Sequence, residues 1–390
     1  MIGKQNQIPT ADILLSGQFP VVDQGQAFIA GYSDAAERVI RDGLPLVIFG
    51  DHTRCLKFVD FPFILGADGT KVLKPREDLF DAKFFYYALL SLDIPNRGYN
   101  RHFTLLKEKK IPRPEKDEQR KIAEVLGVVQ RAMEQQGRLL ALTAELKKTL
   151  LHQLFTQGLR GEPQKQTDLG PVPESWEEVS VGSLIDITHG YGFESRYFTT
   201  SGRIVLTPGN FKLGGGLYWG GRTKYTTEPC SAEFVFRPRD LVVVMTDLTP
   251  SAKLLGTPAF IPDGKVVMHN QRIGKVVLKS DKTTAEFLYW VFLSNPFKKH
   301  MVLTATGSTV RHTSPSRIRE FKFAIPPIDQ QKQIANILNT FDHKLELIEV
   351  KRDILTALFR TLLHQLMTAQ LRVHDLDLPG LEAAIAEGKP

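Results

Sequence analysis

The stretch IPRPEKDEQRKIAEVL, residues 111–126, returns later in the chain as IPPIDQQKQIANIL, residues 325–338. Inside it, EQRKIAEVL (118–126) matches QQKQIANIL (330–338) at an offset of 212 positions, and TLLHQL at 149–154 recurs at 361–366 with the same offset. Residues 118–154 and 330–366 therefore align without a gap, which indicates an internal duplication. A duplication has to be recognised before any fold is assigned.

The duplication extends upstream of the repeated helices. DAKFFYYALLSL (81–92) resembles TAEFLYWVFLSN (284–295), and SGQFPV (16–21) resembles SGRIVL (201–206). The sequence therefore predicts an α+β protein, with two mixed domains separated by two long helices and related by a pseudo-two-fold repeat. The predicted boundaries are a first domain at 1–113, a spacer helix at 114–160, a linker at 161–174, a second domain at 175–326, a second spacer helix at 327–372 and a tail at 373–390.

Prolines precede both helices, where they are tolerated, and Gly158 is a suitable stop for the first. In both helices the apolar residues recur at alternating spacings of three and four, which is typical of a coiled coil. We expect the helices to pack antiparallel against each other, with the two domains at opposite ends. The predicted seam consists of Ile122, Val125, Val129, Ala132, Leu139, Leu146 and Leu150 in the first helix and Ile334, Ile337, Phe341, Ile348, Leu355, Leu358 and Leu362 in the second.

The first helix carries more apolar surface than one partner helix can cover. Its second apolar line comprises Leu126, Met133, Leu140, Leu151 and Leu154. One explanation is that another protein docks on the coiled coil through these residues; the alternative is packing against the chain's own domains. His152 and His364, which occupy the same place in the repeat, are expected to be interface or surface residues.

Composition favours a soluble, cytoplasmic protein without a metal site. Lys and Arg number 50 against 43 Asp and Glu, and the resulting net charge of +7 permits a polyanionic partner without demonstrating one. Cys55 and Cys230 have no metal-ligand spacing and are expected to be reduced. The N-terminus lacks a signal-peptide pattern, and no apolar run approaches the ~20 residues that a membrane span needs.

The two domains contain short apolar runs between Gly, Pro and Asp, such as PLVIFG (45–50) and DLVVVMT (240–246), which are strand signals. Between them lie loops rich in Arg, Asn, Gln and aromatic residues, the side chains that hydrogen-bond base edges or pair with phosphates. Each loop taken alone is more often an ordinary polar turn. The candidate DNA-binding residues are Tyr99, Asn100, Arg101 and His102 in the first domain and Asn270, Gln271, Arg272, Thr309, Arg311 and His312 in the second.

Enzyme motifs find little support. No GxxxxGK[ST] phosphate loop occurs, and Asn295-Pro296-Phe297 lacks the second proline of a base methyltransferase motif. Glu108-Lys109-Lys110 and Glu320-Phe321-Lys322 have a nuclease-like order, but no Pro-Asp pair lies close enough upstream. We expect no catalytic residues, metal ligands or cofactor in this chain.

The repeated helix starts, with GSTVRH before the second, resemble the specificity subunit of type I restriction-modification systems. The resemblance implies that each domain reads one half of a split sequence in double-stranded DNA, and that the coiled coil sets the gap and docks two methylation subunits. Those subunits would carry S-adenosylmethionine and flip out the target adenine. Restriction subunits would supply ATP- and Mg-dependent translocation and cleavage. The competing interpretation is a coiled-coil adaptor that joins proteins without reading DNA.

The first half departs from the second at its start. Residues 172–200 precede SGRIVL, whereas only fifteen residues precede SGQFPV. The first domain is therefore either shortened or completed by a strand from the tail, residues 371–390.

Overall fold

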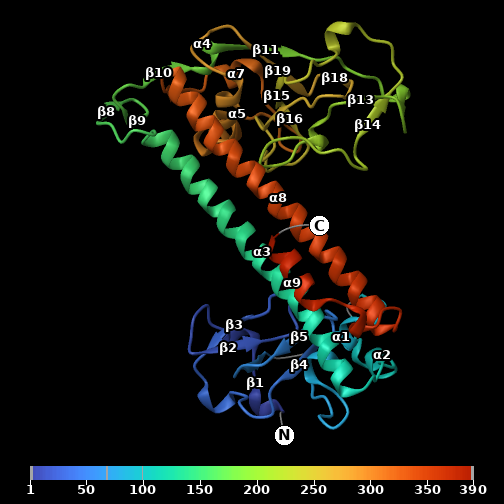
Figure 1. The fold of residues 1–390 in the computed structure, drawn as a ribbon. Coiled ribbons are helices and arrows are strands. Elements are labelled where there is room, and N and C mark those ends of the chain that lie inside the picture. Colours follow the sequence, from blue (N-terminus) through green and yellow to red (C-terminus); the bar gives the residue numbers. More distant parts are fainter. Residues whose placement is uncertain (1–2, 67–68, 99, 388–390) are drawn as a thin grey trace. The chain divides into compact units, whose positions relative to one another are not determined.

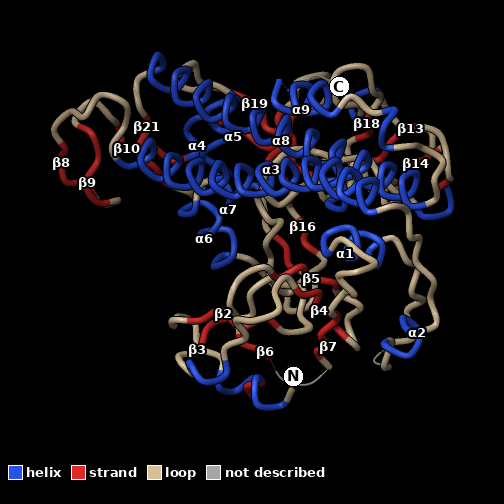
Figure 2. The backbone as a smooth tube through the Cα atoms, turned by 60° about the horizontal axis from the view of Figure 1, so that its bottom comes forward, coloured by secondary structure: helices blue, strands red, loops and turns tan. Residues whose placement is uncertain are grey.

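The computed structural model describes residues 3–66, 69–98 and 100–387. The chain divides into two compact units, one formed by residues 1–140 and 347–390 and the other by residues 141–346. Both combine short strands, long loops and helices (Figure 2), which confirms the predicted α+β class. Two long helices, α3 (Lys116–Thr156) and α8 (Ile328–Met367), each contribute residues to both units (Figure 1).

In the first unit the strands form two small sheets, and the predicted strand segment PLVIFG (45–50) contains the central strand of one of them. One sheet has the order β1 (Gln7–Ile8), β6 (Ile64–Gly66), β2 (Phe19–Val22) and β3 (Gly31–Ser33), and the other β5 (Leu56–Val59), β4 (Leu46–Gly50) and β7 (Thr70–Leu73). The central strand β4 is completely buried, because every residue of LVIFG is apolar or glycine. The helices α1 (Ala82–Leu90) and α2 (Phe103–Lys107) follow.

The second unit repeats this plan with additional elements. One sheet has the order β12 (Phe198–Thr199), β14 (Lys224–Thr226), β13 (Arg203–Val205) and β18 (Val267–Met268), and another β11 (Ile185–His189), β19 (Ile273–Leu278), β15 (Leu241–Val244) and β17 (Pro258–Phe260). Three strand pairs complete it: β8 (Gln164–Thr167) with β9 (Gly170–Pro173), β10 (Glu177–Ser180) with β21 (Lys322–Ile325), and β16 (Thr246–Asp247) with β20 (Arg311–His312). The helices are α4 (Val181–Leu184), α5 (Ala285–Leu293), α6 (Asn295–Thr304) and α7 (Pro315–Arg319).

The strand pairing confirms the duplication and locates the difference between its halves. The parallel pair of β2 and β6 corresponds to that of β13 and β18, and the order β5-β4-β7 corresponds to β17-β15-β19. In the second unit β11 pairs with the free edge of β19, whereas no strand pairs with that edge of β7 among the described residues of the first unit. β11 lies within residues 172–200, the segment of the second half that precedes SGRIVL.

The tail does not replace this strand. Its described residues form a 3-10 turn at Val373–Asp375 and the helix α9 (Leu378–Glu387). Val373 is buried, and Leu376, Leu378 and Leu381 pack against the first unit's core. The alternative in which the tail supplies a strand is therefore wrong for residues 371–387, because the apolar spacing of LPGLEAAI suits a helix.

Within each unit, one part of α3 packs against one part of α8, and the two helices run antiparallel. In the first unit Glu118, near the start of α3, pairs with Arg372, just beyond the end of α8, at 3.2 Å. In the second unit Lys147 of α3 pairs with Asp342 of α8. Arg160, which follows Lys147 in the sequence, pairs with Asp329, which precedes Asp342, as expected for antiparallel helices. Gly158, with a φ of 66°, follows the last turn of α3 as expected for a helix stop.

The burial of the helices corrects the two predicted apolar lines. Leu126 is completely buried and Leu154 is 4% exposed, so neither side chain is available to a docking protein. Met133 and Leu151 are half-buried against the cores of their own units. These four side chains therefore pack against the chain's own domains, because the hydrophobic cores of the two units surround these parts of α3.

The predicted seam is confirmed near the helix ends and wrong near the middle of α3. Ile122, Val125 and Val129 are buried, whereas Leu139 and Leu146 are 40% and 54% exposed. The two repeated histidines, His152 and His364, are exposed as expected. In the part of the chain that the structure describes, every helix is too short or too polar to cross a membrane.

Candidate nucleic-acid interface

In the second unit, the end of strand β15 brings together two loops that were predicted from the sequence to bind DNA. The backbone N–H of Met245 donates to the carbonyl of Arg272 at 2.9 Å, and its carbonyl accepts from Thr313 at 2.9 Å. Directly after it, Thr246 pairs with His312 in the antiparallel β16–β20 ladder. Residues 271–272 and 311–312 therefore flank the same strand end, although they are far apart in sequence.

A third loop, residues 190–194, joins this edge. Tyr191 donates its backbone N–H to His269 at 2.8 Å and accepts from Gln271 at 2.9 Å. The Tyr191 hydroxyl donates to the buried carboxylate of Glu228 at 2.9 Å, and this hydrogen bond raises the pKa of Tyr191. Glu228 also accepts from the backbone of Glu194 at 2.9 Å. One carboxylate thus fixes both ends of the loop.

The side chains of Gln271, Arg272, Thr309 and His312 are exposed. The ring of His312 is held by the Thr246 hydroxyl, which lies 3.2 Å from its Nδ1. Asn270, by contrast, is only 8% exposed, and its Oδ1 accepts from the backbone N–H of Arg272 at 3.0 Å. It shapes the turn that presents Arg272, so its prediction as a base-reading residue is wrong for this conformation. An Asx turn of this kind uses the short Asn side chain to satisfy the backbone locally.

His269 stabilises the same turn through its buried ring. Its ring is 3% exposed, and Nε2 lies 2.9 Å from the carbonyl oxygen of Ile273, so Nε2 carries the proton and donates. Burial lowers the pKa of His269, which keeps the ring neutral.

The side chain of Arg311 forms hydrogen bonds within its own unit. One guanidinium nitrogen donates to the carbonyl of Val302 at 3.2 Å and to that of Ala305 at 3.4 Å, at the C-terminal end of α6. A cationic side chain at this position satisfies carbonyls that the helix leaves without partners. The guanidinium of Arg311 is half-buried and bonded within the unit, so base reading by Arg311 would require these hydrogen bonds to break. Its Nε is buried with no partner among the described residues.

In the first unit, Asp51 follows the buried strand β4 and fixes the loop that precedes α2. Its Oδ1 accepts from the backbone of Phe103 at 2.8 Å, and its carbonyl accepts from both the backbone N–H and Nδ1 of His102 at 2.9 Å. Nε2 of His102 accepts from the backbone of Arg97 at 3.2 Å. His102 is completely buried with both ring nitrogens engaged, so its prediction as a DNA-contacting residue is wrong.

The neighbouring residues of that loop remain accessible. Arg101 and Asn100 are exposed, and the amide of Asn100 donates to the carbonyl of Arg97. Tyr99 lies outside the described residues. Arg101-His102 and Arg311-His312 therefore differ in role: the histidine is buried in the first pair, and the arginine is held within the unit in the second.

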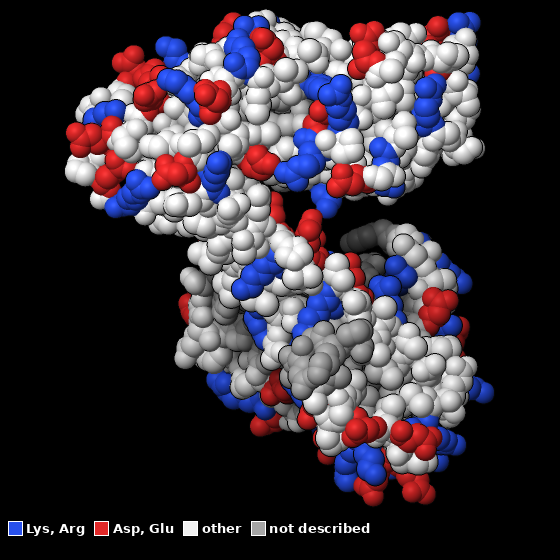
Figure 3. Space-filling view, turned by 45° about the horizontal axis from the view of Figure 1, so that its top comes forward, with Lys and Arg blue, Asp and Glu red and all other residues white. Residues whose placement is uncertain are grey.

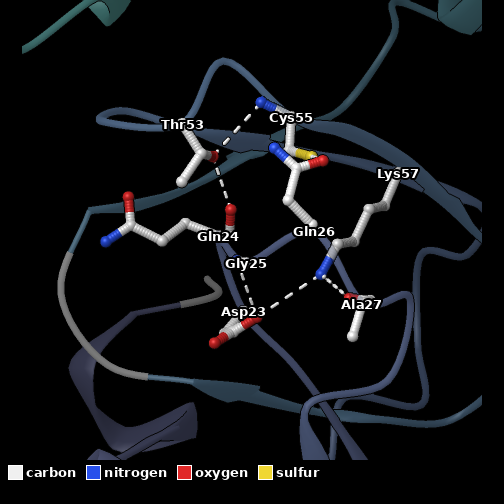
Figure 4. A network of polar contacts seen from close by, with 8 residues as sticks. All are labelled: Asp23, Gln24, Gly25, Gln26, Ala27, Thr53, Cys55 and Lys57. Carbon is white, nitrogen blue, oxygen red and sulfur yellow. Dashed lines mark hydrogen bonds and ion pairs between the residues drawn. The ribbon is translucent and has the colours of Figure 1, made fainter. Parts of the chain in front are cut away.

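One loop at this end of the first unit was not predicted from the sequence. Figure 4 shows residues 23–27 lying against residues 53–57: the hydroxyl of Thr53 donates to the carbonyl of Gln24 at 2.5 Å, and the ammonium of Lys57 donates to Ala27 at 2.5 Å. Lys57 is 4% exposed and lies 3.4 Å from Asp23. The signal was present in the polar, glycine-containing DQGQA that follows a strand.

The edge residues of the first unit are joined through residues 51–55. Gln24 Oε1 accepts from the backbone of His52 at 3.2 Å, while Asp51 holds the segment around His102. Gln26 is exposed beside Cys55, whose thiol donates to its Oε1 at 3.3 Å. Gln26, Asn100 and Arg101 therefore belong to loops that meet at one strand end, as Gln271, Arg272 and His312 do in the second unit.

The surface charge is mixed. On the face shown in Figure 3, acidic and basic side chains are interspersed. Among the described residues, no group of three or more His, Cys, Asp or Glu is placed to hold a metal ion.

Comparison with known proteins gives consistent matches. Residues 173–357 match the family model described as type I restriction modification DNA specificity domain. The specificity subunit of the type I restriction enzyme MjaVIII of Methanocaldococcus jannaschii is 24% identical over 273 residues, which cover 69% of this chain and 63% of that protein. The putative MjaX specificity subunit of the same organism is 22% identical over 327 residues, covering 80% and 73%.

The fold comparison extends over nearly the whole chain. The crystal structure of the specificity subunit of a type I restriction-modification system from M. genitalium superposes with a TM-score of 0.61 at 18% identity, covering 94% of this chain and 91% of the other. At this identity the likeness establishes the fold. Together with the sequence matches, it confirms the resemblance drawn from the repeated helices.

Proposed function

Because residues 173–357 match the type I restriction modification DNA specificity domain and the chain is similar to type I specificity subunits, we propose that it binds DNA in a sequence-specific manner. The proposed target is a bipartite site in double-stranded DNA. One observation carries the proposal: equivalent strand ends in the two units present different sets of exposed amide and guanidinium side chains. Gln26, Asn100 and Arg101 belong to one set, and Gln271 and Arg272 to the other.

Phosphate contacts by Lys and Arg would supply most of the affinity and make it salt-dependent. The side chains at the two strand ends would supply sequence choice, with Arg pairing to guanine and Asn or Gln to adenine. Each good pair is worth about 1–3 kcal/mol of discrimination. Two units with one scaffold and unlike loops are suited to reading two unlike half-sites.

Catalysis would lie on other subunits. We place S-adenosylmethionine on two methylation subunits, and ATP and Mg on restriction subunits, with no catalytic residue in this chain. Docking on the helices is supported by α8, where Leu347, Val350 and Ile354 recur at spacings of three and four and are 56%, 57% and 54% exposed. These residues replace Leu126 and Leu154 as candidates, because an exposed apolar stripe marks an interaction surface.

The adaptor without DNA readout is the second candidate. It accounts for the exposed stripe on α8 but leaves the exposed Arg, Asn and Gln side chains at both strand ends without a role. It predicts no salt-dependent binding of duplex DNA.

The experiment is methylation mapping. The chain is expressed with a methylation subunit of the same organism, and modified adenines are read across the host genome. The expected result is one motif made of two half-sites with a fixed gap. The variant Arg272→Ala should relax one half-site only, while Arg237→Ala, at the other end of β15, should leave the motif unchanged. Absence of modification together with absence of duplex binding would support the adaptor.

A further inference from the structure

The second unit contains a cavity of about 730 Å³ beside α3, α5 and α6. Leu151 of α3, Leu293 at the end of α5 and Val302 of α6 form part of its lining, together with the loops at residues 213–214 and 252–253. Its volume lies within the range of about 300–1,000 Å³ that is typical of ligand sites. It shares no lining residue with the candidate nucleic-acid interface.

Large apolar side chains are exposed around the cavity. Leu303 is 73% exposed, Leu213 is 61% exposed and Val302 is 41% exposed. Exposure of single apolar residues is ordinary, but a cluster that lines a concave site favours an interaction surface. Because hydrophobic stabilisation follows the apolar area removed from water, an occupant must itself bring apolar side chains.

The charged residues that line the cavity are all lysines. Its lining includes Lys147, Lys148, Lys253, Lys298 and Lys299, and among the described residues that line it there is no Asp or Glu. Lys148, Lys253 and Lys299 are exposed and make no ion pair within the described part of the chain. An occupant with carboxylates would therefore meet several uncompensated ammonium groups.

Two of the lysines are already engaged. Lys147 pairs with Asp342 and lies 4.8 Å from the ring centre of Trp290. Lys298 donates to the hydroxyl of Thr257 at 2.5 Å and to the carbonyl of Leu255 at 3.4 Å, and burial lowers its pKa to about 7. The inner wall is thus fixed by internal contacts, while the rim lysines are free to bind.

We infer that this cavity docks a segment of a partner protein that carries large apolar side chains next to carboxylates. The inference rests on the proposed function, because the methylation subunit is the partner that would bring this segment. Duplex DNA fits the cavity less well: phosphates would meet the lysines, but nothing on a DNA backbone would cover Leu213, Val302 and Leu303. Apolar contact with complementary charge at the rim is typical of protein–protein docking.

The test measures binding of the full chain to the methylation subunit and, separately, to duplex DNA. Leu303→Asp places a charge in the apolar lining, and Lys299→Glu reverses the charge of the rim. The matched controls are Val266→Asp and Lys265→Glu, since Val266 is 58% exposed and neither residue lines the cavity. We expect each cavity variant to weaken subunit binding at least tenfold and each control to change it less than twofold, with duplex binding retained by all four.

Carbodiimide cross-linking of the wild-type complex tests the chemistry of the occupant. This reagent joins a lysine amine to a carboxylate in contact with it, so mass spectrometry should find Lys148, Lys253 or Lys299 linked to Asp or Glu of the partner. Cross-links from other lysines only would contradict the inference.

The remaining outcomes separate the inference from the proposed function. If the wild-type chain binds both the subunit and DNA while both cavity variants bind the subunit normally, the docking site is wrong and the proposed function stands. If the cavity variants lose duplex binding instead, the cavity is a nucleic-acid surface and the inference fails. If the wild-type chain binds neither ligand, the proposed function fails with it.

Discussion

Gln119 and Gln331, which are matched by the internal repeat, make the same hydrogen bonds in their respective units. Each side-chain amide donates at 2.9 Å to the carbonyl of the proline five residues earlier, Pro114 or Pro326. Each also donates to a second carbonyl, that of Leu79 at 3.0 Å or Lys282 at 2.7 Å. Both glutamines are completely buried. A single side chain thus fastens the start of each long helix to the domain before it.

Replacing this glutamine should destabilise its unit. In Gln331→Ala the carbonyls of Pro326 and Lys282 and the hydroxyl of Thr283 lose their partner. Because an unpaired buried group costs about 1–3 kcal/mol, we expect a loss of roughly 2–4 kcal/mol. Urea unfolding followed by tryptophan fluorescence measures it in the right place, since Trp176, Trp219 and Trp290 all belong to the second unit.

The control for this experiment is Gln333→Ala, two residues further along α8, where the side chain is exposed. Its unfolding midpoint should stay close to that of the wild-type protein. Equal midpoints for the two variants would contradict the fastening role of Gln331.

The pair Arg101 and His102 should separate recognition from stability. His102→Ala removes one of the two donors to the Asp51 carbonyl and the acceptor of the Arg97 N–H, so amide hydrogen exchange at Arg97 and residues 102–106 should become faster. Arg101→Ala should leave exchange unchanged and weaken duplex binding. If His102→Ala changed sequence preference with normal exchange, the buried structural role would be wrong.

The three arginines of the second unit should give three different results. Arg272→Ala is expected to weaken binding to the cognate site by about tenfold to a hundredfold, as loss of one base contact would. Arg311→Ala should speed hydrogen exchange at the end of α6, since the carbonyls of Val302 and Ala305 lose their donor. Arg237→Ala, at the other end of β15, should change neither. Titrations at two salt concentrations distinguish a base contact from a phosphate contact, because loss of a phosphate contact flattens the salt dependence.

Lys298 should make the stability of the second unit depend on pH. Burial lowers its pKa to about 7 from an ordinary value of 10.5, so between these values the unfolded chain holds the proton more often than the folded one. Stability contributed by this group therefore rises with pH from about 7 to 10.5, and the cost of burying the charge is fully present below 7. In Lys298→Met that cost is absent, so the variant's advantage over wild type should be largest below pH 7 and shrink as pH rises.

Urea unfolding at several pH values measures this difference. Lys299→Met is the control, because Lys299 is exposed in the same helix. A constant difference between Lys298→Met and wild type from pH 6 to pH 10 would contradict the lowered pKa.

Some features of the candidate site were visible in the sequence because they depend on neighbouring residues. The loops after strands were recognisable from glycine and polar residues, and Gln271, Arg272 and Arg101 are exposed as expected. The loop at residues 23–27 was missed because its position beside residues 53–57 depends on contacts between distant segments.

By itself, the sequence determined the duplication, the two long helices and some of the strands, because a repeat and an apolar period are properties of the linear chain. Only the tertiary structure decided which polar and apolar side chains are accessible. His102 and His312 end similar Arg-His pairs, yet one is buried and the other exposed. For Leu126 and Leu154 the sequence allowed either another protein or the chain's own domains as the partner, and the structure places both in the cores of their own units. Burial depends on which distant segments pack around a residue, and the spacing of residue types along the sequence does not specify those segments.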